Sequence, residues 1–258
     1  MKQRFVTGTL AGIFFLLAAL WGGPFFTTVV TLLAGVGFWE FLRMKHFSLL
    51  SVPGVVGVAA ILLLVPVSLS LPVEPVHVLL LLFVLLLFYT VWSQNDFTFD
   101  DAAFVFLAIF YVGFGFHYML LIRFEDHGFR ALLFVLLLIW SSDSGAYFCG
   151  SAFGKRKLLP SISPKKTVEG AVGGICAAVI VAIGFQLLFP VADGWSQSLF
   201  AAVVISVLGQ FGDLIESAFK RHYGVKDSGT LLPGHGGILD RCDSWLIVLP
   251  VVYLLNVV

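Results

Sequence analysis

The sequence predicts an all-α integral membrane protein with about nine transmembrane helices and its N-terminus in the cytoplasm. Of its 258 residues, 59% are hydrophobic and only 12% are charged, whereas soluble domains carry about 25% charged residues. The apolar residues form continuous stretches, and a helix needs roughly 20 of them to cross about 30 Å of hydrocarbon. The period-two alternation of a membrane barrel is absent, so we expect helical spans.

Nine apolar stretches are candidates for these spans. In chain order they cover residues 5–21, 25–42, 55–71, 76–92, 102–122, 131–149, 168–189, 199–215 and 245–258. The first follows Lys2 and Arg4 as a secretory signal would, but it runs into Trp21 rather than a small-residue cleavage site, so we expect a retained helix. The first half has few polar features. We therefore expect a scaffold of about five helices over residues 1–130 and a catalytic region of about four helices over residues 131–258.

The orientation follows from the positions of the lysines and arginines. With nine spans and a cytoplasmic N-terminus, 13 of the 15 basic residues fall on the cytoplasmic side, as the positive-inside rule requires. Only Arg123 and Arg130 fall outside. The two most polar loops then face the cytoplasm, where nucleotides are found.

Polar sequence within the sixth span is the first candidate for chemistry. Asp143 lies in the block WSSDSGAY, residues 140–147. A carboxylate at this depth is costly unless it faces water, pairs with a cation or binds a metal ion. Asp143 is therefore either a solvated helix-end carboxylate or part of a polar cavity wall.

The loop before the seventh span is strongly basic. It contains Lys155, Arg156, Lys157, Lys165 and Lys166, which suit an anionic lipid headgroup or a polyphosphate but also suit a plain positive-inside loop.

The end of this loop predicts the start of a helix. Ser163 is the expected N-cap and Pro164 the expected first position, which would leave backbone amides free for phosphate. Gly170 and Gly174, four residues apart, predict a close helix contact in the seventh span.

A third block follows the eighth span. If the helix of the eighth span continues through Arg221, one of its faces carries this arginine together with Asp213, Glu216, Ser217 and Lys220. Asp240 and Asp243 are three residues apart at the start of the ninth span and project from one side.

Acids from two helix ends, beside Lys220 and Arg221, make a poor structural ion-pair network, because crowded carboxylates repel and buried charge is costly. A divalent cation would relieve the repulsion, and oxygen ligands suit Mg²⁺. Between the helices, Gly236 and Gly237 have no side chains and would let backbone amides approach a phosphate.

The run SAFKRHYGVKDSGTLLPGHGGILDRCD, residues 217–243, resembles the signature of the phosphatidate cytidylyltransferases, also called CDP-diacylglycerol synthases. The segments DSGAY and SPKKTVEG resemble secondary motifs of that family. The resemblance covers residues 141–244. It implies synthesis of CDP-diacylglycerol and pyrophosphate from CTP and phosphatidate, by a homodimer in the bacterial inner membrane whose active site faces the cytoplasm. It also implies Mg²⁺, with a second cation such as K⁺, near Asp213 and Asp240; no nucleic-acid partner is expected.

These arguments assign roles to individual residues. Metal binding is expected at Asp213 and Asp240, with Asp243 and Asp143 as secondary ligands. Contacts to the triphosphate are expected from Lys220, Arg221, Lys226 and Arg241, and further substrate contacts from Ser163, Lys165, Lys166, Gly236 and Gly237. Ser217 is expected to orient a phosphate or a water on the ion. His235 either donates to a phosphate or structures the turn, and Asp227 is a candidate general base that an ionised phosphate hardly needs.

Two alternatives remain at this point. A CDP-alcohol phosphotransferase also uses clustered aspartates with Mg²⁺, but in an order that this chain lacks. An ion-coupled transporter would bind cations near the bilayer midplane, whereas these acids lie at cytoplasmic helix ends.

Overall fold

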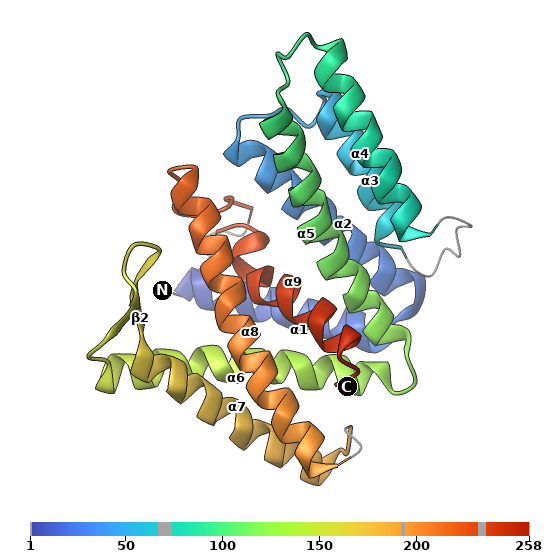
Figure 1. The fold of residues 1–258 in the computed structure, drawn as a ribbon. Helices are drawn as coiled ribbons and strands as arrows, with labels where there is room; N and C mark the ends of the chain where they lie inside the picture. The colour runs from blue at the N-terminus through green and yellow to red at the C-terminus, as the bar shows by residue number, and fades with distance from the viewer. Residues whose placement is uncertain (1, 67–73, 192–193, 232–235, 258) are drawn as a thin grey trace. The chain divides into compact units, whose positions relative to one another are not determined.

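The computed structural model describes residues 2–66, 74–191, 194–231 and 236–257, with side chains from residue 7 onward. These residues form nine helices and one short hairpin, so the protein is nearly all-α, as predicted (Figure 1). The helices are α1 (Lys2–Trp21), α2 (Gly23–Met44), α3 (Val52–Leu64), α4 (Pro75–Trp92), α5 (Phe99–Phe124), α6 (Gly128–Phe153), α7 (Val168–Leu188), α8 (Trp195–His222) and α9 (Leu239–Leu254). The antiparallel hairpin is β1 (Lys157–Leu159) and β2 (Ser163–Thr167).

Six of the described helices are long and apolar enough to cross a membrane. They are α2, α4, α5, α6, α7 and α8. The apolar parts of α1 and α3 are shorter, and α9 has 16 residues. The protein is therefore a membrane protein with several spanning helices, while the total of nine spans stays a prediction for the three shorter helices.

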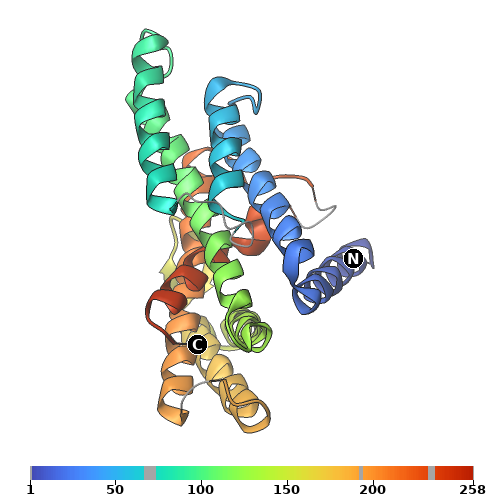
Figure 2. The ribbon, with the colours of Figure 1, turned by 90° about the vertical axis from the view of Figure 1, so that its right-hand side faces the viewer.

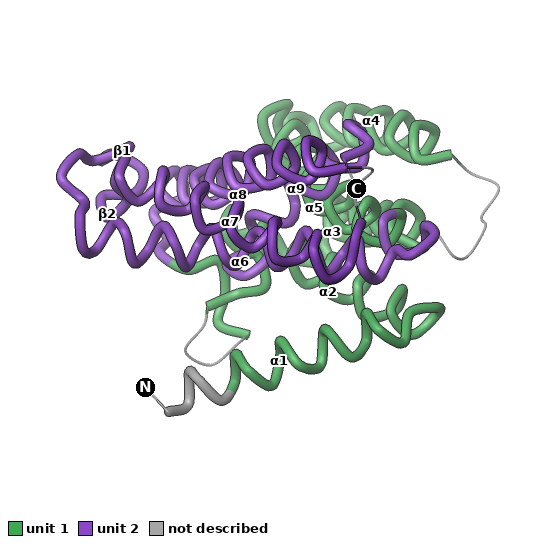
Figure 3. Tube along the Cα trace, turned by 90° about the horizontal axis from the view of Figure 1, so that it is seen from below, with its two compact units in different colours: residues 1–121, 227–239 green, residues 122–226, 240–258 purple. Residues whose placement is uncertain are grey.

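The chain divides into two compact units (Figure 3). Unit 1 comprises Met1–Leu121 and Asp227–Leu239, and unit 2 comprises Ile122–Lys226 and Asp240–Val258. The segment Asp227–Leu239, which we call the signature loop, therefore groups with the N-terminal helices although it follows α8 in the chain.

Unit 1 is built around α2, whose neighbour α3 also packs against α4 (Figures 1 and 2). Pro24 lies in the first turn of α2, where the missing amide hydrogen costs nothing. Ser51 caps α3 by accepting a hydrogen bond from the amide of Gly54. Phe38 of α2 is fully buried and fits beside Gly57 of α3, where no side chain would find room.

Unit 2 is held together by close contacts between α6, α7 and α8. A β-carbon on Gly174 of α7 would lie 2.8 Å from the carbonyl oxygen of Ser142, and one on Gly170 would lie 2.8 Å from that of Ala146. The predicted close contact at these two glycines is confirmed. Ser142 of α6 also shares a 2.6 Å hydrogen bond with Ser206 of α8, so this serine of the polar block faces a neighbouring helix, whereas Asp143 is exposed.

The predicted helix start at Ser163 is wrong. Residues Ser163–Thr167 form strand β2, which pairs with β1, and α7 begins only at Val168. Thr167 is the N-cap, because its hydroxyl accepts a 3.1 Å hydrogen bond from the amide of Gly170. Strand pairing already engages this segment, so the amides near Ser163 do not form the expected helix N-terminus.

Candidate active site

Within unit 2, the contact between α8 and α9 sets the positions of Asp213, which lies in α8, and of Asp240 and Asp243, which lie in α9. Ser244 of α9 donates a 3.0 Å hydrogen bond from its hydroxyl to the carbonyl oxygen of Gly209 in α8. A β-carbon on Gly212 would lie 2.7 Å from the carbonyl oxygen of Asp243 and 2.8 Å from the α-carbon of Ser244. Glycine at position 212 therefore permits the backbones to approach at the residue next to Asp213.

Asp213 is more accessible than Asp240, the other acid that is expected to bind a metal ion. Its side chain is 37% exposed, and its Oδ2 lies 2.7 Å from the Nζ of Lys166 on β2. Ser217, one turn further along α8, donates a 3.2 Å hydrogen bond to Oδ1. Lys166 also donates to the carbonyl oxygen of Gln210 at 3.3 Å. The basic hairpin and α8 thus meet at a carboxylate that retains exposed surface.

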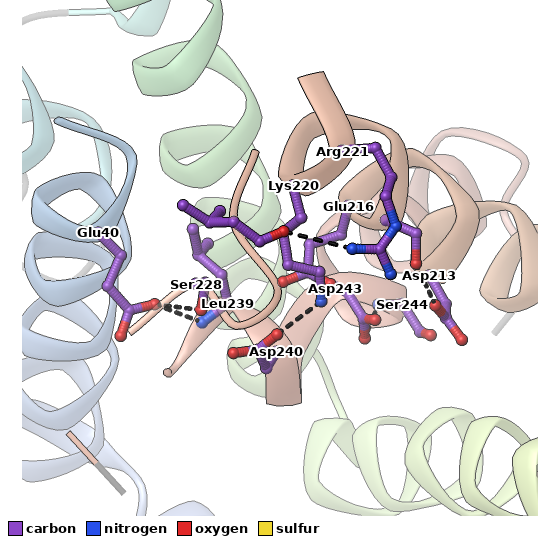
Figure 4. Close-up of polar contacts among 12 residues, drawn as sticks. Glu40, Asp213, Glu216, Lys220, Arg221, Ser228, Leu239, Asp240, Asp243 and Ser244 are labelled. Carbon is purple, nitrogen blue, oxygen red and sulfur yellow. Dashed lines mark hydrogen bonds and ion pairs between the residues drawn. The ribbon is translucent and has the colours of Figure 1, made fainter. Parts of the chain in front are cut away.

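Asp240 lies in a more enclosed ion pair (Figure 4). The Nζ of Lys220 is 2.6 Å from Oδ1 of Asp240 and 2.5 Å from Oε2 of Glu216. The side chains of Asp240 and Glu216 are only 6% and 1% exposed. One ammonium group therefore bridges two carboxylates, one from α8 and one from α9. The predicted continuation of the eighth helix through Arg221 is confirmed, since α8 ends at His222.

Asp143, Asp213, Asp240 and Asp243, which we call the acid cluster, come from α6, α8 and α9. Asp143 and Asp243 both experience the negative charge of Asp213. Among the described residues, no three His, Cys, Asp or Glu side chains surround a common point as ligands of one ion. Mg²⁺ commonly needs only one or two carboxylates together with substrate phosphates, so the oxygen donors of the cluster fit this ion.

The hairpin and the residues just before it present several basic side chains besides Lys166, which pairs with Asp213 of the acid cluster. Glu169 of α7 accepts hydrogen bonds from the amides of Lys155 at 3.0 Å and Arg156 at 3.1 Å, which ties the start of the hairpin to the start of α7. The side chains of Lys155, Arg156, Lys157 and Lys165 are exposed. They are accessible to an anionic ligand, as a phosphate-binding loop requires.

The remaining predicted site residues lie in the last turn of α8 or after it. Arg221, Lys226 and Asp227 are exposed, and so is Arg241. Arg221 donates a 3.3 Å hydrogen bond to the carbonyl oxygen of Val225, and Gly224 adopts a φ of +67°, which glycine accepts at a helix end. His235 falls in residues 232–235, outside the described residues. Gly236 and Gly237 belong to unit 1.

Sequence reasoning overlooked Glu40, an acid in the second predicted span. It is fully buried in α2, and its carboxylate accepts hydrogen bonds from Ser228, Ile238 and Leu239. Gly237, expected to face a phosphate, instead packs against this carboxylate. The available signal was the acid itself, because an ionisable residue inside an apolar span has a functional or pairing role by default.

The known proteins to which this chain is similar are enzymes. The sequence model of the cytidylyltransferase family matches residues 2–258. A phosphatidate cytidylyltransferase of Bacillus subtilis (strain 168) is 46% identical over 261 residues, which cover 99% of this chain and 97% of the relative. Those of Staphylococcus epidermidis (strain RP62A) and Staphylococcus aureus (strain COL) are 42% and 40% identical over 258 residues, covering 99% of this chain and 98% of each relative.

These matches decide against both alternatives considered from the sequence, the CDP-alcohol phosphotransferase and the transporter. They extend through the apolar first half, where the sequence motifs gave no information. The chain is therefore an enzyme of the cytidylyltransferase family and belongs, within it, with the phosphatidate cytidylyltransferases.

Proposed function

We propose that the acid cluster is the place where this enzyme transfers the cytidylyl group of CTP to phosphatidate. Membership in the family supports synthesis of CDP-diacylglycerol from these two substrates. The observation that carries the assignment to this place is the pair of lysine bridges, Lys166 to Asp213 and Lys220 to Asp240. Acids and cations alternate there on elements that the family signature and its secondary motifs encode.

The reaction joins two anions, so charge neutralisation is its main requirement. A phosphate oxygen of phosphatidate forms a bond to the α-phosphorus of CTP while the bond from that phosphorus to the bridging oxygen breaks, and pyrophosphate leaves in line. No base is needed, because the attacking phosphate is already ionised at neutral pH. This leaves Asp227 without a necessary catalytic task.

The acid cluster supplies oxygen ligands for the ions that such a transfer uses. Mg²⁺, with a second cation such as K⁺, would be held by Asp213 and Asp240, with Asp243 and Asp143 nearby, and would neutralise charge on the phosphate oxygens. The hydrogen bond from Ser217 orients the Asp213 carboxylate. Lys220, which was expected to contact the triphosphate, pairs with Asp240 and balances the charge of Glu216.

Exposed basic side chains have a different task in this proposal. Lys165 and Lys166 of β2 and Arg221, Lys226 and Arg241 near the ends of α8 and α9 bind the phosphates of CTP and the lipid headgroup. Lys166 already pairs with Asp213, so an incoming phosphate exchanges one anionic partner of this lysine for another. The basic residues therefore contribute to substrate binding more than to the bond-forming step.

The proposed orientation places these groups on the cytoplasmic face of a bacterial inner membrane, where CTP is available. The distribution of basic residues supports it. A cysteine introduced at the exposed Lys165 in an otherwise cysteine-free variant should react with a membrane-impermeant maleimide in inside-out vesicles and not in intact spheroplasts. Reaction in spheroplasts would reverse the orientation. We also expect a homodimer, which light scattering of the detergent-purified protein would detect.

The reaction is tested by incorporation of radiolabelled CTP into chloroform-soluble product. The purified enzyme should form labelled CDP-diacylglycerol only when phosphatidate is present, and a chelator should abolish the incorporation until Mg²⁺ is restored. Unchanged incorporation in the presence of the chelator would rule out the metal-assisted mechanism. Product formed from CDP-diacylglycerol and an alcohol, with none from CTP and phosphatidate, would overturn the assigned reaction.

A further inference from the structure

Glu40 is a completely buried carboxylate in a region that otherwise resembles a plain membrane scaffold. It lies near the end of α2 and is 0% exposed. Removing a carboxylate from water costs several kcal/mol unless hydrogen bonds or a cation compensate. The hydrogen-bond partners that compensate this cost therefore indicate the role of Glu40.

Three hydrogen-bond donors of the signature loop reach Glu40, and Figure 4 shows those from Ser228 and Leu239. The hydroxyl of Ser228 donates to Oε2 at 2.9 Å. The amide of Ile238 donates to Oε1 at 2.8 Å, and the amide of Leu239 donates to Oε2 at 2.9 Å. One carboxylate therefore binds both ends of the loop, at position 228 and at positions 238 and 239, and holds them together.

Two glycines of the loop shape the space around this carboxylate. A β-carbon on Gly229 would lie 2.5 Å from Oε1 of Glu40 and 2.9 Å from its Cδ. A β-carbon on Gly237 would collide with both carboxylate oxygens and with the hydroxyl of Ser228. The glycines are thus required by the close approach of Glu40, and the loop and the acid fit one another in shape as well as in hydrogen bonding.

The hydrogen bonds to Ile238 and Leu239 also stabilise the start of α9. That helix begins at Leu239, and its first amides have no partner within the helix. An anionic acceptor at a helix N-terminus is favourable, because the unpaired amides and the helix dipole give that end positive character. The Glu40 carboxylate therefore caps the N-terminus of α9, although Glu40 precedes Leu239 by 199 residues in the chain.

We infer that Glu40 is a positioning residue for cytidylyl transfer, acting through the signature loop on the first turn of α9. Asp240 follows Leu239 directly in the chain, so a fixed Leu239 amide limits the directions available to the Asp240 carboxylate. The inference rests on the proposed metal-binding role of Asp240. It assigns to the N-terminal scaffold a direct part in preparing the site.

The test compares Glu40→Gln with a matched control in the same helix. Glutamine keeps the shape but replaces one acceptor oxygen by an NH₂ group, which would face a donor, so at least one hydrogen bond is lost. Thr27→Val is the control, because Thr27 is also buried in α2 but donates within the helix to Gly23. Both variants are purified as the full chain in detergent, with Asp240→Asn as the reference for the metal site.

Glu40→Gln should lower kcat by about tenfold, the effect of losing a hydrogen bond to a charged group. It should also raise the Mg²⁺ concentration for half-maximal activity by about tenfold, because a residue that positions the proposed metal ligand Asp240 is weakened. Without any substrate or metal, trypsin should cleave after the exposed Lys226 about five times faster, because the adjacent loop opens more often. Thr27→Val should match the unsubstituted enzyme in all three measurements.

A wild-type cleavage rate after Lys226 together with a wild-type Mg²⁺ dependence in Glu40→Gln would overturn the inference. So would equal losses in Thr27→Val. If Glu40→Gln does not fold, Ser228→Ala replaces it in the test. This variant keeps the hydrogen bonds from the Ile238 and Leu239 amides and should change kcat, the Mg²⁺ dependence and the cleavage rate in the same directions by about two- to threefold. No change in these quantities would overturn the inference. Normal activity of Asp240→Asn would instead refute the role of Asp240, and the cleavage rate would still decide whether Glu40 holds the loop.

Discussion

Glu40 and Glu216 are both almost fully buried, one in each unit, and their environments differ in kind. Glu40 accepts hydrogen bonds from two backbone amides and a hydroxyl, which are neutral donors. Glu216 lies 2.5 Å from the ammonium of Lys220, which it shares with Asp240. Hydrogen bonds from neutral donors hold the Glu40 carboxylate and the loop in one geometry. A lysine shared by two carboxylates instead balances their charge and can change partners when another ion binds. In our proposal, Glu40 of unit 1 fixes the geometry of the signature loop, and the acid cluster supplies the electrostatics of the reaction.

The largest effect is expected from breaking the charge balance in unit 2. Lys220→Met leaves the 1% exposed Glu216 without its cation, and among the described residues no donor reaches its Oε1. Loss of one partner of a buried ion pair costs about 3 kcal/mol or more, equivalent to roughly 5–10 °C in the midpoint of thermal unfolding. Adding Glu216→Gln should restore most of this stability without restoring activity. Equal midpoints for the single and double variants would show that the pair does not carry the charge balance.

The acid cluster itself is tested by neutral substitutions of the same shape. Asp213→Asn and Asp240→Asn should each lower turnover by at least about 100-fold, because both remove a ligand charge that the transition state needs. The amount of folded protein, measured by size-exclusion chromatography, should change little. Near-normal synthesis of CDP-diacylglycerol by either variant would contradict its assignment as a metal ligand.

The α8–α9 contact is tested by adding one methyl group. A β-carbon at Gly212 would meet backbone atoms of Asp243 and Ser244 at 2.7–2.8 Å, and overpacking of this kind costs about 1–3 kcal/mol. Gly212→Ala should therefore separate the helices and lower turnover by about tenfold, read in the CTP incorporation assay.

Gly184→Ala in α7 is the matched control, because nothing lies within 4 Å of a β-carbon there. Alanine should stabilise this helix by about 0.5–1 kcal/mol. Equal turnover in the two alanine variants would mean that the α8–α9 approach does not set the geometry of the acids.

The smallest effect is expected from the exposed hairpin. Lys166→Ala should raise the apparent KM for CTP or phosphatidate by about two- to fivefold, the usual contribution of a partly exposed charge. Lys165→Ala should raise this KM less, because Lys165 does not pair with Asp213. The two lysines are neighbours in β2, so each is the control for the other. Unchanged KM values in the double variant would leave the hairpin as a topology signal only.

Much of the fold was predictable because lipid requires long apolar helices, and the bounds of α7 differ by only one residue from the predicted 168–189. The face that carries Asp213, Ser217 and Lys220 was also predictable, since helical spacing alone brings such residues together. Ser163 was misassigned because Ser-Pro is typical of a helix start, whereas pairing with β1 makes the segment a strand. The role of Glu40 could not be predicted, because its partners lie 188–199 residues away in the chain.

Binding of Mn²⁺ to the purified protein, followed by electron paramagnetic resonance, tests the central claim most directly because it needs neither turnover nor substrate. Mn²⁺ accepts the same oxygen ligands as Mg²⁺. The unsubstituted enzyme should bind Mn²⁺ in competition with Mg²⁺, and Asp213→Asn should weaken that binding by at least about tenfold, while Thr27→Val should leave it unchanged. Equal Mn²⁺ binding by the enzyme and by Asp213→Asn would contradict a cation site built on the acids of α8 and α9.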